Sequence, residues 1–395
     1  MFLTSRSFKV YFIFIFLLVS FLLTSITSFE LYKHKEAFTI GDWLINYQGG
    51  FVRRGLIGEI IINLSYLTNS NPGLITSYTH ILFYFLFFLF SFLAINQQNH
   101  LKNHWILIFS PFLFYFQIFD FYGGFRKEII FFSLFAFLVW SFNKFEEKKL
   151  DKIFFTTLAF YSFLILSHEI FIIFLPYIIV SYLLKVEINK KRIIYLILFL
   201  LPSLICFIFS ILNPGDKEIV EKIFLSLENQ NYKMSGGAIE WLIKDTNHGI
   251  NTVKEYIDKF NYFSKYSIII LLSLIAYYPL REIFKRISKK KINLIIFFLP
   301  IVGTFLISYV AVDWGRFIYI NLVSIFFISL IKIDSYQNQK IIFSWYLLVP
   351  LSIIYFSFWQ IPHCCNFFPL FNNELTTTNI FKLIKFLGQF ANNYI

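Results

Sequence analysis

The chain has 395 residues, of which 57% are hydrophobic and only 15% are charged, and it contains 56 phenylalanines. Soluble domains average about 25% charged residues, so this composition excludes an ordinary soluble protein. The formal net charge is +12, but the placement of the charges, described below, favours lipid headgroups over nucleic acid as the partner.

Apolar runs close to the length of about 20 residues that crosses a bilayer recur along the whole chain. The first, at about 10–29, follows Arg6 and Lys9 and resembles a signal peptide. It lacks a small-residue cleavage site, so we interpret it as a retained first helix. Further spans are predicted at about 75–95, 104–120, 128–142, 153–168, 170–184, 193–212, 266–280, 292–311, 317–331 and 341–359. The prediction is a single all-α integral membrane domain, 1–395, with about eleven transmembrane helices.

The charges between these spans predict the orientation. The first residues and alternate loops carry 19 Lys and Arg against 6 Asp and Glu, a net charge of +13. The other side keeps 16 of the 35 basic and 17 of the 23 acidic residues, a net charge of −1. Short loops rich in Lys and Arg remain cytoplasmic, which predicts a cytoplasmic amino terminus and an external carboxyl terminus.

Three external segments follow from this topology. The first, 30–74, contains an apolar periodic stretch at 56–67 that is too short to span and predicts an interfacial helix starting after Arg53-Arg54-Gly55. The largest, 213–265, has two amphipathic stretches, 218–227 and 239–260, on either side of Ser235-Gly236-Gly237, and predicts a helical cap. The external tail, 361–395, has one candidate surface helix at 379–390.

Four polar clusters lie on this predicted external side. They are Asp42 with Arg53, Arg54 and Glu59; Asp120 with Arg126, Lys127 and Glu128; His168 with Glu169; and Asp313 with Arg316. Ionisable groups at membrane depth are costly and usually face a polar cavity or a partner. The topology therefore predicts that the four clusters meet at one face of the membrane.

These residue types suit phosphate and sugar chemistry. The planar guanidinium donates paired hydrogen bonds and keeps its charge, so Arg53, Arg54, Arg126 and Arg316 could hold a diphosphate. A carboxylate or a histidine nearby could take a proton from an attacking hydroxyl. The aromatic residues Trp43, Tyr47, Tyr122 and Trp314 offer faces that stack on sugar rings.

Each cluster also has a purely structural interpretation. Arg53 and Arg54 could anchor the interfacial helix at headgroup level, and Arg126-Lys127-Glu128 could be an ordinary helix start. His168-Glu169 could be a polar hairpin turn, and Asp313 and Arg316 could pair across one helical turn. For His168-Glu169 the structural interpretation is the stronger of the two.

Other chemistries find little support. No Walker motif, nucleophile elbow or dinucleotide fingerprint occurs, so a nucleotide-driven cytoplasmic enzyme is disfavoured. No spacing of His, Cys and carboxylates predicts a metal site, and no cofactor is expected. His248 and His363 are expected at the surface, and the adjacent Cys364 and Cys365 predict no disulfide framework, because neighbouring cysteines form a strained bridge.

In length, span number, phenylalanine content and a large late external loop (213–265), the chain resembles bacterial O-antigen polymerases of the Wzy type. External arginines and the segment Asp313-Trp314-Gly315-Arg316 add to the likeness. The resemblance implies metal-independent glycosyl transfer in lipopolysaccharide synthesis, joining undecaprenyl-diphosphate-linked oligosaccharide units at the periplasmic face of the inner membrane. It also implies a flippase and a chain-length regulator as possible partners.

On this resemblance, Arg53, Arg54, Arg126, Lys127 and Arg316 would hold the diphosphate and glycan together with Asp120 and Asp313. Asp42, His168 or Glu169 would be the catalytic base. The chain is also similar to GT-C class membrane glycosyltransferases, which carry an acidic residue in a long first external loop and use a polyprenyl-phosphate sugar; the segment 30–74 with Asp42 fits that pattern. A flippase for lipid-linked sugars is a third alternative, disfavoured because the charges gather at span ends without matching halves. A structural scaffold is the fourth.

Overall fold

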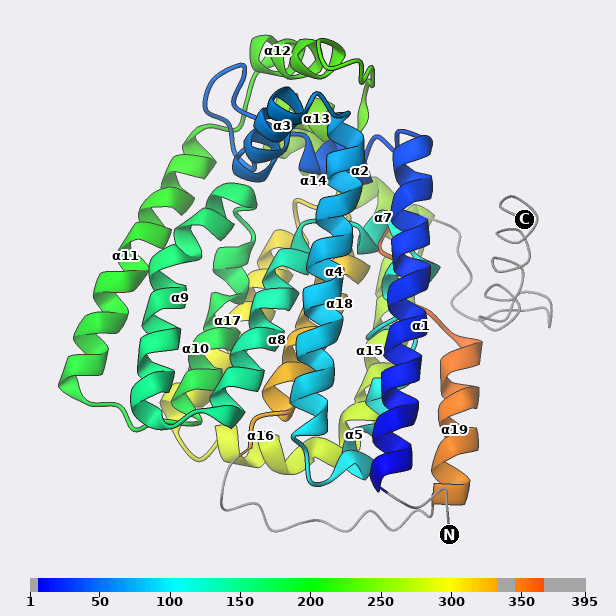
Figure 1. The fold of residues 1–395 in the computed structure, drawn as a ribbon, viewed down its shortest axis with the longest axis vertical. Helices are drawn as coiled ribbons and strands as arrows, with labels where there is room; N and C mark the ends of the chain where they lie inside the picture. Colours follow the sequence, from blue (N-terminus) through cyan, green and yellow to red (C-terminus); the bar gives the residue numbers. More distant parts are fainter. Residues whose placement is uncertain (1–5, 333–344, 366–395) are drawn as a thin grey trace.

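The computed structural model describes residues 6–332 and 345–365, and within them the chain is all α-helical, without a β-strand. The helices run up and down in one bundle, and a set of short helices covers its upper end (Figure 1). The long helices are α1 (Arg6–Lys33), α4 (Pro72–Asn96), α8 (Glu128–Lys144), α9 (Glu147–Ser167), α10 (Phe171–Leu183), α11 (Lys190–Leu212), α15 (Tyr262–Tyr277), α17 (Lys291–Ile307), α18 (Trp314–Ser329) and α19 (Trp345–Phe358). The predicted surface helix at 379–390 and Lys340 lie outside the described residues.

Five described helices are long and apolar enough to cross a bilayer: α1, α4, α9, α11 and the helix Tyr262–Leu280, which joins α15 to the 3-10 turn η3 (Tyr278–Leu280). Apolar helices of 10–17 residues (α3, Leu56–Thr68; α10; α17; α18; α19) accompany them. The side chains on the outer faces of these helices are apolar. Of the five long helices, α11 is the most exposed, because only 11% of its apolar 18-residue stretch is buried inside the protein. The prediction of an all-α, membrane-embedded protein is confirmed at this level.

The predicted span at 104–120 is wrong as a single helix. The chain forms α5 (Leu101–Ile108), an irregular buried stretch, α6 (Phe116–Phe119) and α7 (Phe121–Gly124) instead. Pro111 has no N–H to continue a helix, and it disfavours helical geometry at Ser110. The break leaves Asp120 at the start of α7, where its carboxylate accepts a hydrogen bond from the Gly123 N–H.

The short helices of the upper end come from two distant parts of the chain (Figure 1). The first segment supplies α2 (Thr39–Trp43) and α3, and the predicted cap supplies α12 (Lys217–Glu228), α13 (Gly237–Glu240), η2 (Trp241–Ile243) and α14 (Thr246–Lys259). The break between η2 and α14 divides the predicted stretch 239–260, because Asp245 caps a new helix there. At the lower end α16 (Arg281–Ile287) links α15 to α17.

The two upper segments are joined through their backbones. The Arg53 N–H donates to the Asn213 carbonyl (2.9 Å), and the Ala238 N–H donates to the Ala37 carbonyl (3.1 Å). Gly237 has a φ of +67°, and a Cβ there would lie 2.1 Å from the Ala37 oxygen, so only glycine allows this approach. The contacts hold the first segment in place above the bundle.

Substitution of Gly58 in α3 tests how tightly the layer of short helices is packed. A Cβ on Gly58 would lie 1.9 Å from the Ile45 carbonyl oxygen, against backbone that cannot move aside. We expect Gly58→Ala to cost about 1–3 kcal/mol or more, because overpacking forces backbone shifts, and to lower the thermal unfolding temperature of the purified protein. Leu67→Ala, on the same helix at an 80% exposed position, is the matched control. Equal melting temperatures for the two variants would contradict the tight contact.

Candidate functional site

Side chains from all four predicted polar clusters meet beneath the upper layer of short helices. Arg54, from the loop before α3, reaches Glu169, which lies in the turn between α9 and α10. Arg316 in the first turn of α18 pairs with Glu128 at the start of α8. The predicted convergence of the clusters is therefore present in the structure, and most of the charged groups in it are buried.

The Arg54–Glu169 pair is bidentate. Arg54 Nη2 lies 2.6 Å from Glu169 Oε1, and Nε donates to both carboxylate oxygens at 2.9 and 3.0 Å. His168 Nδ1 lies 3.4 Å from Glu169 Oε2. Burial alone would raise the pKa of Glu169, but Arg54 and His168 hold it well below its usual range. Arg54 itself has a φ of +67°, a conformation that few non-glycine residues adopt.

A second ion-pair group is built on the first turn of α18. Arg316 Nε lies 3.3 Å from Glu128 Oε1, and its Nη1 lies 3.1 Å from Asp313 Oδ2. The N–H groups of Gly315 and Arg316 donate to the His363 carbonyl, at 2.9 and 3.4 Å, which satisfies free donors at the helix start. The expected pairing of Asp313 with Arg316 is present, and it extends to Glu128.

Arg126 and Lys127 have no carboxylate at ion-pair distance among the described residues. Arg126 donates to the carbonyls of Phe38 (2.8 Å) and Tyr122 (3.1 Å). Lys127 donates to the Arg54 carbonyl at 2.8 Å and is fully buried. Both cations are thus held in position by backbone oxygens, and their charges are not cancelled by direct contact.

Among the charged groups, Asp42 is the one that interacts most strongly with Arg126 and Lys127. It is 1% exposed, and neither carboxylate oxygen has a hydrogen-bond partner among the described residues. Burial would raise the pKa of Asp42, but Lys127, Arg126, His168 and Arg54, in decreasing order, bring it below its usual range. The result is a buried ionised carboxylate with unused lone pairs, which is uncommon because such groups are normally hydrogen-bonded.

Two neighbours of Asp42 also have shifted proton affinities. Burial lowers the pKa of Lys127 to about 8, with Asp42 opposing the shift and Arg54 adding to it. Burial and Arg54 lower the pKa of His168, so its imidazole is neutral at pH 7. His168 Nδ1 accepts a hydrogen bond from the Ile170 N–H at 3.3 Å, so the neutral ring carries its proton on Nε2. Nε2 has no hydrogen-bond partner in the described chain and can donate to a ligand.

Arg53 and Glu59 lie further from the centre. Arg53 is half-buried, and burial lowers its pKa, as does neighbouring Arg54. Glu59 accepts hydrogen bonds from the Tyr47 N–H and from Gln48 Nε2 at 2.9 and 2.8 Å. Glu59 therefore shapes the loop that presents the arginines and does not join the buried cluster.

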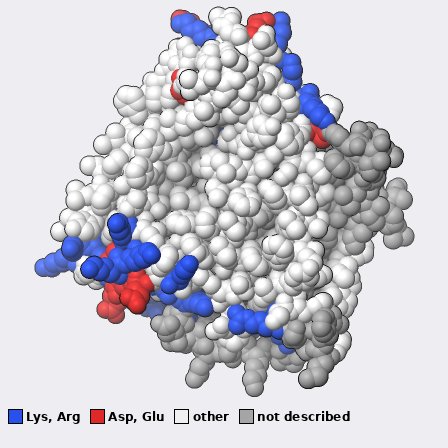
Figure 2. Space-filling model, in the orientation of Figure 1, with Lys and Arg blue, Asp and Glu red and all other residues white. Residues whose placement is uncertain are grey.

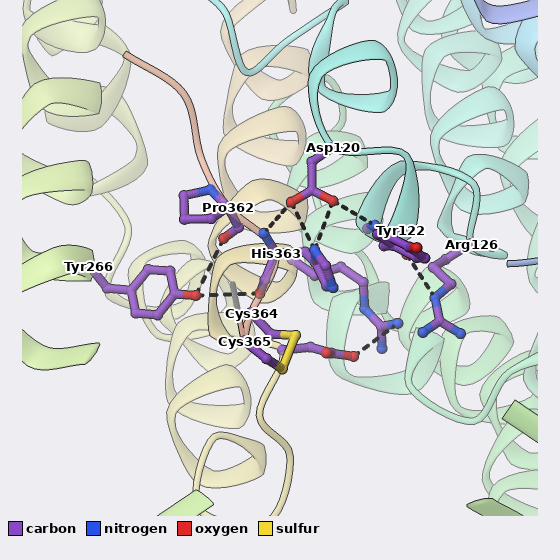
Figure 3. Close-up of a disulfide and its surroundings, with 11 residues drawn as sticks. Asp120, Tyr122, Arg126, Tyr266, Pro362, His363, Cys364 and Cys365 are labelled. Carbon is purple, nitrogen blue, oxygen red and sulfur yellow. Dashed lines mark hydrogen bonds and ion pairs between the residues drawn. A yellow bond between two sulfur atoms is a disulfide. The ribbon is translucent and has the colours of Figure 1, made fainter. Parts of the chain in front are cut away.

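Asp120 has a different set of partners. Its oxygens accept hydrogen bonds from the His363 N–H (2.6 Å) and the Gly123 N–H (3.1 Å), and His363 Nδ1 lies 2.7 Å from Oδ1 (Figure 3). The expectation of an exposed His363 is wrong, because the residue is only 8% exposed. Asp120 thereby joins the start of α7 to the segment that supports α18.

Cys364 and Cys365 form a disulfide directly after His363 (Figure 3). The sequence predicted no disulfide framework, and this bridge joins only two neighbouring residues. The ring links neighbouring residues and closes no long loop, so it fixes local backbone and does not join elements. The sequence gives no signal for His363 at the site, because its partner Asp120 is 243 residues away.

One group in the described chain has ligand atoms placed as a metal site requires: those of Asp313, His363 and Cys364 lie within 4.8 Å of one another. The Cys364 sulfur belongs to the disulfide, Asp313 pairs with Arg316, and His363 Nδ1 is taken by Asp120. In this bonded state the group fits an ion poorly, because a thiolate is the form of cysteine that binds metals.

The aromatic residues are placed unevenly for sugar stacking. Trp43 is fully buried, packs edge-on against His80 and donates to the Phe125 carbonyl at 3.1 Å. The expectation that it offers a face to a sugar is therefore wrong. Trp314, Tyr47 and Tyr122 are partly exposed.

Comparison with protein-family models, curated proteins and solved structures finds no match. The function of the candidate site is therefore inferred from the geometry of its own residues.

Asp120 and Asp216 are both helix N-caps, but only Asp120 also binds a distant segment. We expect Asp120→Asn to cost about 1–3 kcal/mol, because the amide keeps only one of the two oxygens that accept the hydrogen bonds from Gly123 and His363, and a buried donor is left without its partner. Asp216→Asn on exposed α12 should cost a few tenths of a kcal/mol, since asparagine also caps helices. Thermal unfolding of the two purified variants checks this. An Asp120→Asn variant as stable as Asp216→Asn would show that the contact with His363 contributes little.

Proposed function

We propose that this protein is a membrane glycosyltransferase that takes a sugar from a polyprenyl-linked phosphate donor at the upper face in Figure 1, predicted to be external. The observation that carries the proposal is Asp42, a buried carboxylate without hydrogen-bond partners in the described chain. Two cations that are themselves bound to backbone oxygens, Lys127 and Arg126, lower its pKa against the effect of burial. A carboxylate that can receive a proton, next to cations that can hold a phosphate, is the pair of groups that the reaction needs.

The basic residues supply the phosphate-binding half. Lys127 and Arg126 keep charge available, because neither forms an ion pair in the described chain. Arg54 becomes available if the donor phosphate replaces Glu169 on its guanidinium fork. As the bond between the sugar carbon and the phosphate oxygen breaks, these cations stabilise the negative charge on the leaving phosphate.

Asp42 supplies the other half. The acceptor hydroxyl forms the new bond to the sugar carbon, and its proton passes to the Asp42 carboxylate. Burial raises the pKa of Asp42, but Lys127 and Arg126 together lower it by more. Asp42 is therefore a weak base when no donor is bound. A bound phosphate places negative charge beside the same cations and raises the pKa of Asp42, so the base strengthens when donor is present. His168 is the alternative proton acceptor, and its Nδ1 would have to give up the hydrogen bond from the Ile170 N–H to take the proton.

Our proposal for the particular reaction is the joining of undecaprenyl-diphosphate-linked repeat units, as in an O-antigen polymerase of the bacterial inner membrane, with eleven spans and a cytoplasmic amino terminus. The packing of 213–265 onto the first segment supports it, since this cap lies next to Arg53 and could cover a growing glycan. A flippase and a chain-length regulator would be its partners.

A GT-C type enzyme with a polyprenyl-phosphate sugar donor is the second candidate. Asp42 lies a few residues after α1 in a first segment that carries two short helices, α2 and α3. The charges of the site also favour a smaller anion. The buried cluster has four cations (Arg54, Arg126, Lys127, Arg316) and four carboxylates (Asp42, Glu128, Glu169, Asp313), so its formal charge is balanced. A phosphate must therefore replace a carboxylate on its cation, as on Arg54, and one phosphate needs fewer such replacements than two.

Deletion of the gene separates the two candidates. A lipopolysaccharide ladder that collapses to core plus one repeat unit is expected of a polymerase, whereas loss of even that unit indicates a sugar-adding transferase. Asp42→Asn should reproduce the deletion while the protein still inserts, because the amide cannot accept the proton. Glu221→Gln, an exposed carboxylate on α12, should leave the ladder intact. A wild-type ladder in Asp42→Asn would remove Asp42 from the mechanism.

The pH dependence of the reaction tests Lys127. With a pKa of about 8, this lysine is charged below pH 8 and neutral above it, so we expect donor affinity to fall as the pH rises through 8. The arginine in Lys127→Arg stays charged and should move the fall to higher pH, whereas Lys127→Met should have weak affinity throughout. Donor titrations of the purified enzyme from pH 6.5 to 9.5 measure this. A wild-type affinity that is constant over this range would contradict the assigned role.

A further inference from the structure

A second charged feature lies at the opposite end of the molecule, between the starts of α9 and α11. A cleft of about 620 Å³ opens there, with a basic rim of Lys148, Lys152, Lys191 and Arg192. Figure 2 shows this patch at the lower left, where blue Lys and Arg surround a small red group. None of the residues proposed for glycosyl transfer lines the cleft.

The rim carries more positive than negative charge. Of the lining residues, four are basic and one, Asp151, is acidic. With Glu147, which pairs with Arg192, the excess is two positive charges. Arg192 takes most of the available acid: its Nη2 lies 2.8 Å from Asp151 Oδ2 and 2.6 Å from Glu147 Oε1. The three lysines are exposed around this ion-pair group, so their charges face the cleft mouth and solvent.

The helix ends add to the same field. The amino termini of α9 and α11, at Glu147 and Lys190, both lie at this cleft. A helix amino terminus carries partial positive charge and disfavours basic side chains in its first turn. The first turn of α11 is nevertheless Lys190-Lys191-Arg192. Asn189 already accepts a hydrogen bond from the Arg192 N–H at the start of α11, and α9 has the acidic Glu147 in its first turn. The lysine side chains therefore supply most of the attraction for an anion.

Apolar side chains continue the cleft along the bundle. Phe155 and Phe160 on α9 and Tyr195 and Phe199 on α11 line it beyond the basic rim. Phe160 is 60% exposed on the apolar surface that faces the bilayer. The cleft therefore combines an anion site at headgroup level with an apolar channel at the depth of the acyl chains.

We infer that this cleft is a binding site for an anionic glycerophospholipid, whose phosphate lies among Lys148, Lys152 and Lys191 and whose acyl chain lies against Phe155 and Phe199. Basic pockets between transmembrane helices on the predicted cytoplasmic side suit such headgroups. The ion pairs of Arg192 fix the starts of α9 and α11 relative to each other, so the lysines are held at one spacing. The inference does not depend on the proposed glycosyl transfer.

The test is lipid binding to the full-length protein, measured by native mass spectrometry with phosphatidylglycerol, phosphatidylcholine and undecaprenyl phosphate added in turn. The wild type should bind phosphatidylglycerol at least tenfold more tightly than phosphatidylcholine. The triple variant Lys148→Gln, Lys152→Gln, Lys191→Gln should lose that preference, and its exposed positions leave the fold intact. The control Lys217→Gln, Lys244→Gln, Lys254→Gln removes the same charge from exposed positions at the upper end and should bind as the wild type does.

Three results would overturn the inference. They are equal binding of the two phospholipids by the wild type, a tenfold preference retained by the triple variant, and tighter binding of undecaprenyl phosphate than of phosphatidylglycerol at this cleft. The last result would assign the cleft to a polyprenyl carrier. Thermal unfolding of both triple variants without lipid separates a loss of binding from a loss of fold.

Discussion

The cost of burying charge at a membrane boundary is the constraint on which the upper half of this molecule depends. A single unpaired ion taken out of water costs several kcal/mol, so buried charges persist only in compensated groups. The cluster meets this requirement by joining ions from separate helix ends: Arg54 with Glu169, and Arg316 with Glu128 and Asp313. Because the Arg54–Glu169 and Arg316–Glu128 pairs join different parts of the chain, the electrostatics and the helix packing support each other. Removing one member would leave a buried charge on another helix.

Asp42 departs from this rule in a way that fits a functional group better than a structural one. A carboxylate kept for stability would accept hydrogen bonds, as Asp120 does from His363 and Gly123. Asp42 accepts none in the described chain, although cations surround it. The nearest of these in effect, Lys127, donates instead to the Arg54 carbonyl. Unused lone pairs in a positive surrounding are expected where a ligand supplies the missing hydrogen bond.

The sequence predicted the parts of this arrangement that depend on local patterns. Apolar length placed most helices within a few residues, Arg54-Gly55 preceded α3 as expected, and the distribution of charge placed the polar clusters at one end. It could not predict features that depend on contacts between distant residues. His363 looked like a surface residue because Asp120, its partner, is 243 residues away. Trp43 looked available to a sugar, but the helix α4 that covers it lies about thirty residues later in the chain. The helix break near Pro111 was a local signal that the apolar composition obscured.

The charged residues are buried at one end of the bundle and exposed at the other, and this difference bears on what each end binds. At the upper end the charges are mostly buried and nearly balanced in sign, so a ligand must exchange partners with existing groups, as a phosphate would with Glu169 on Arg54. Exchange of this kind favours a ligand of defined shape, because each lost ion pair must be replaced in the same geometry. At the lower end the lysines beside α9 and α11 are exposed and in excess. Binding there breaks no ion pair, so headgroups can come and go while the lipid chain provides most of the contact. The proposed chemical site and the proposed lipid site are thus separated by an apolar belt, where Figure 2 shows an almost uncharged surface.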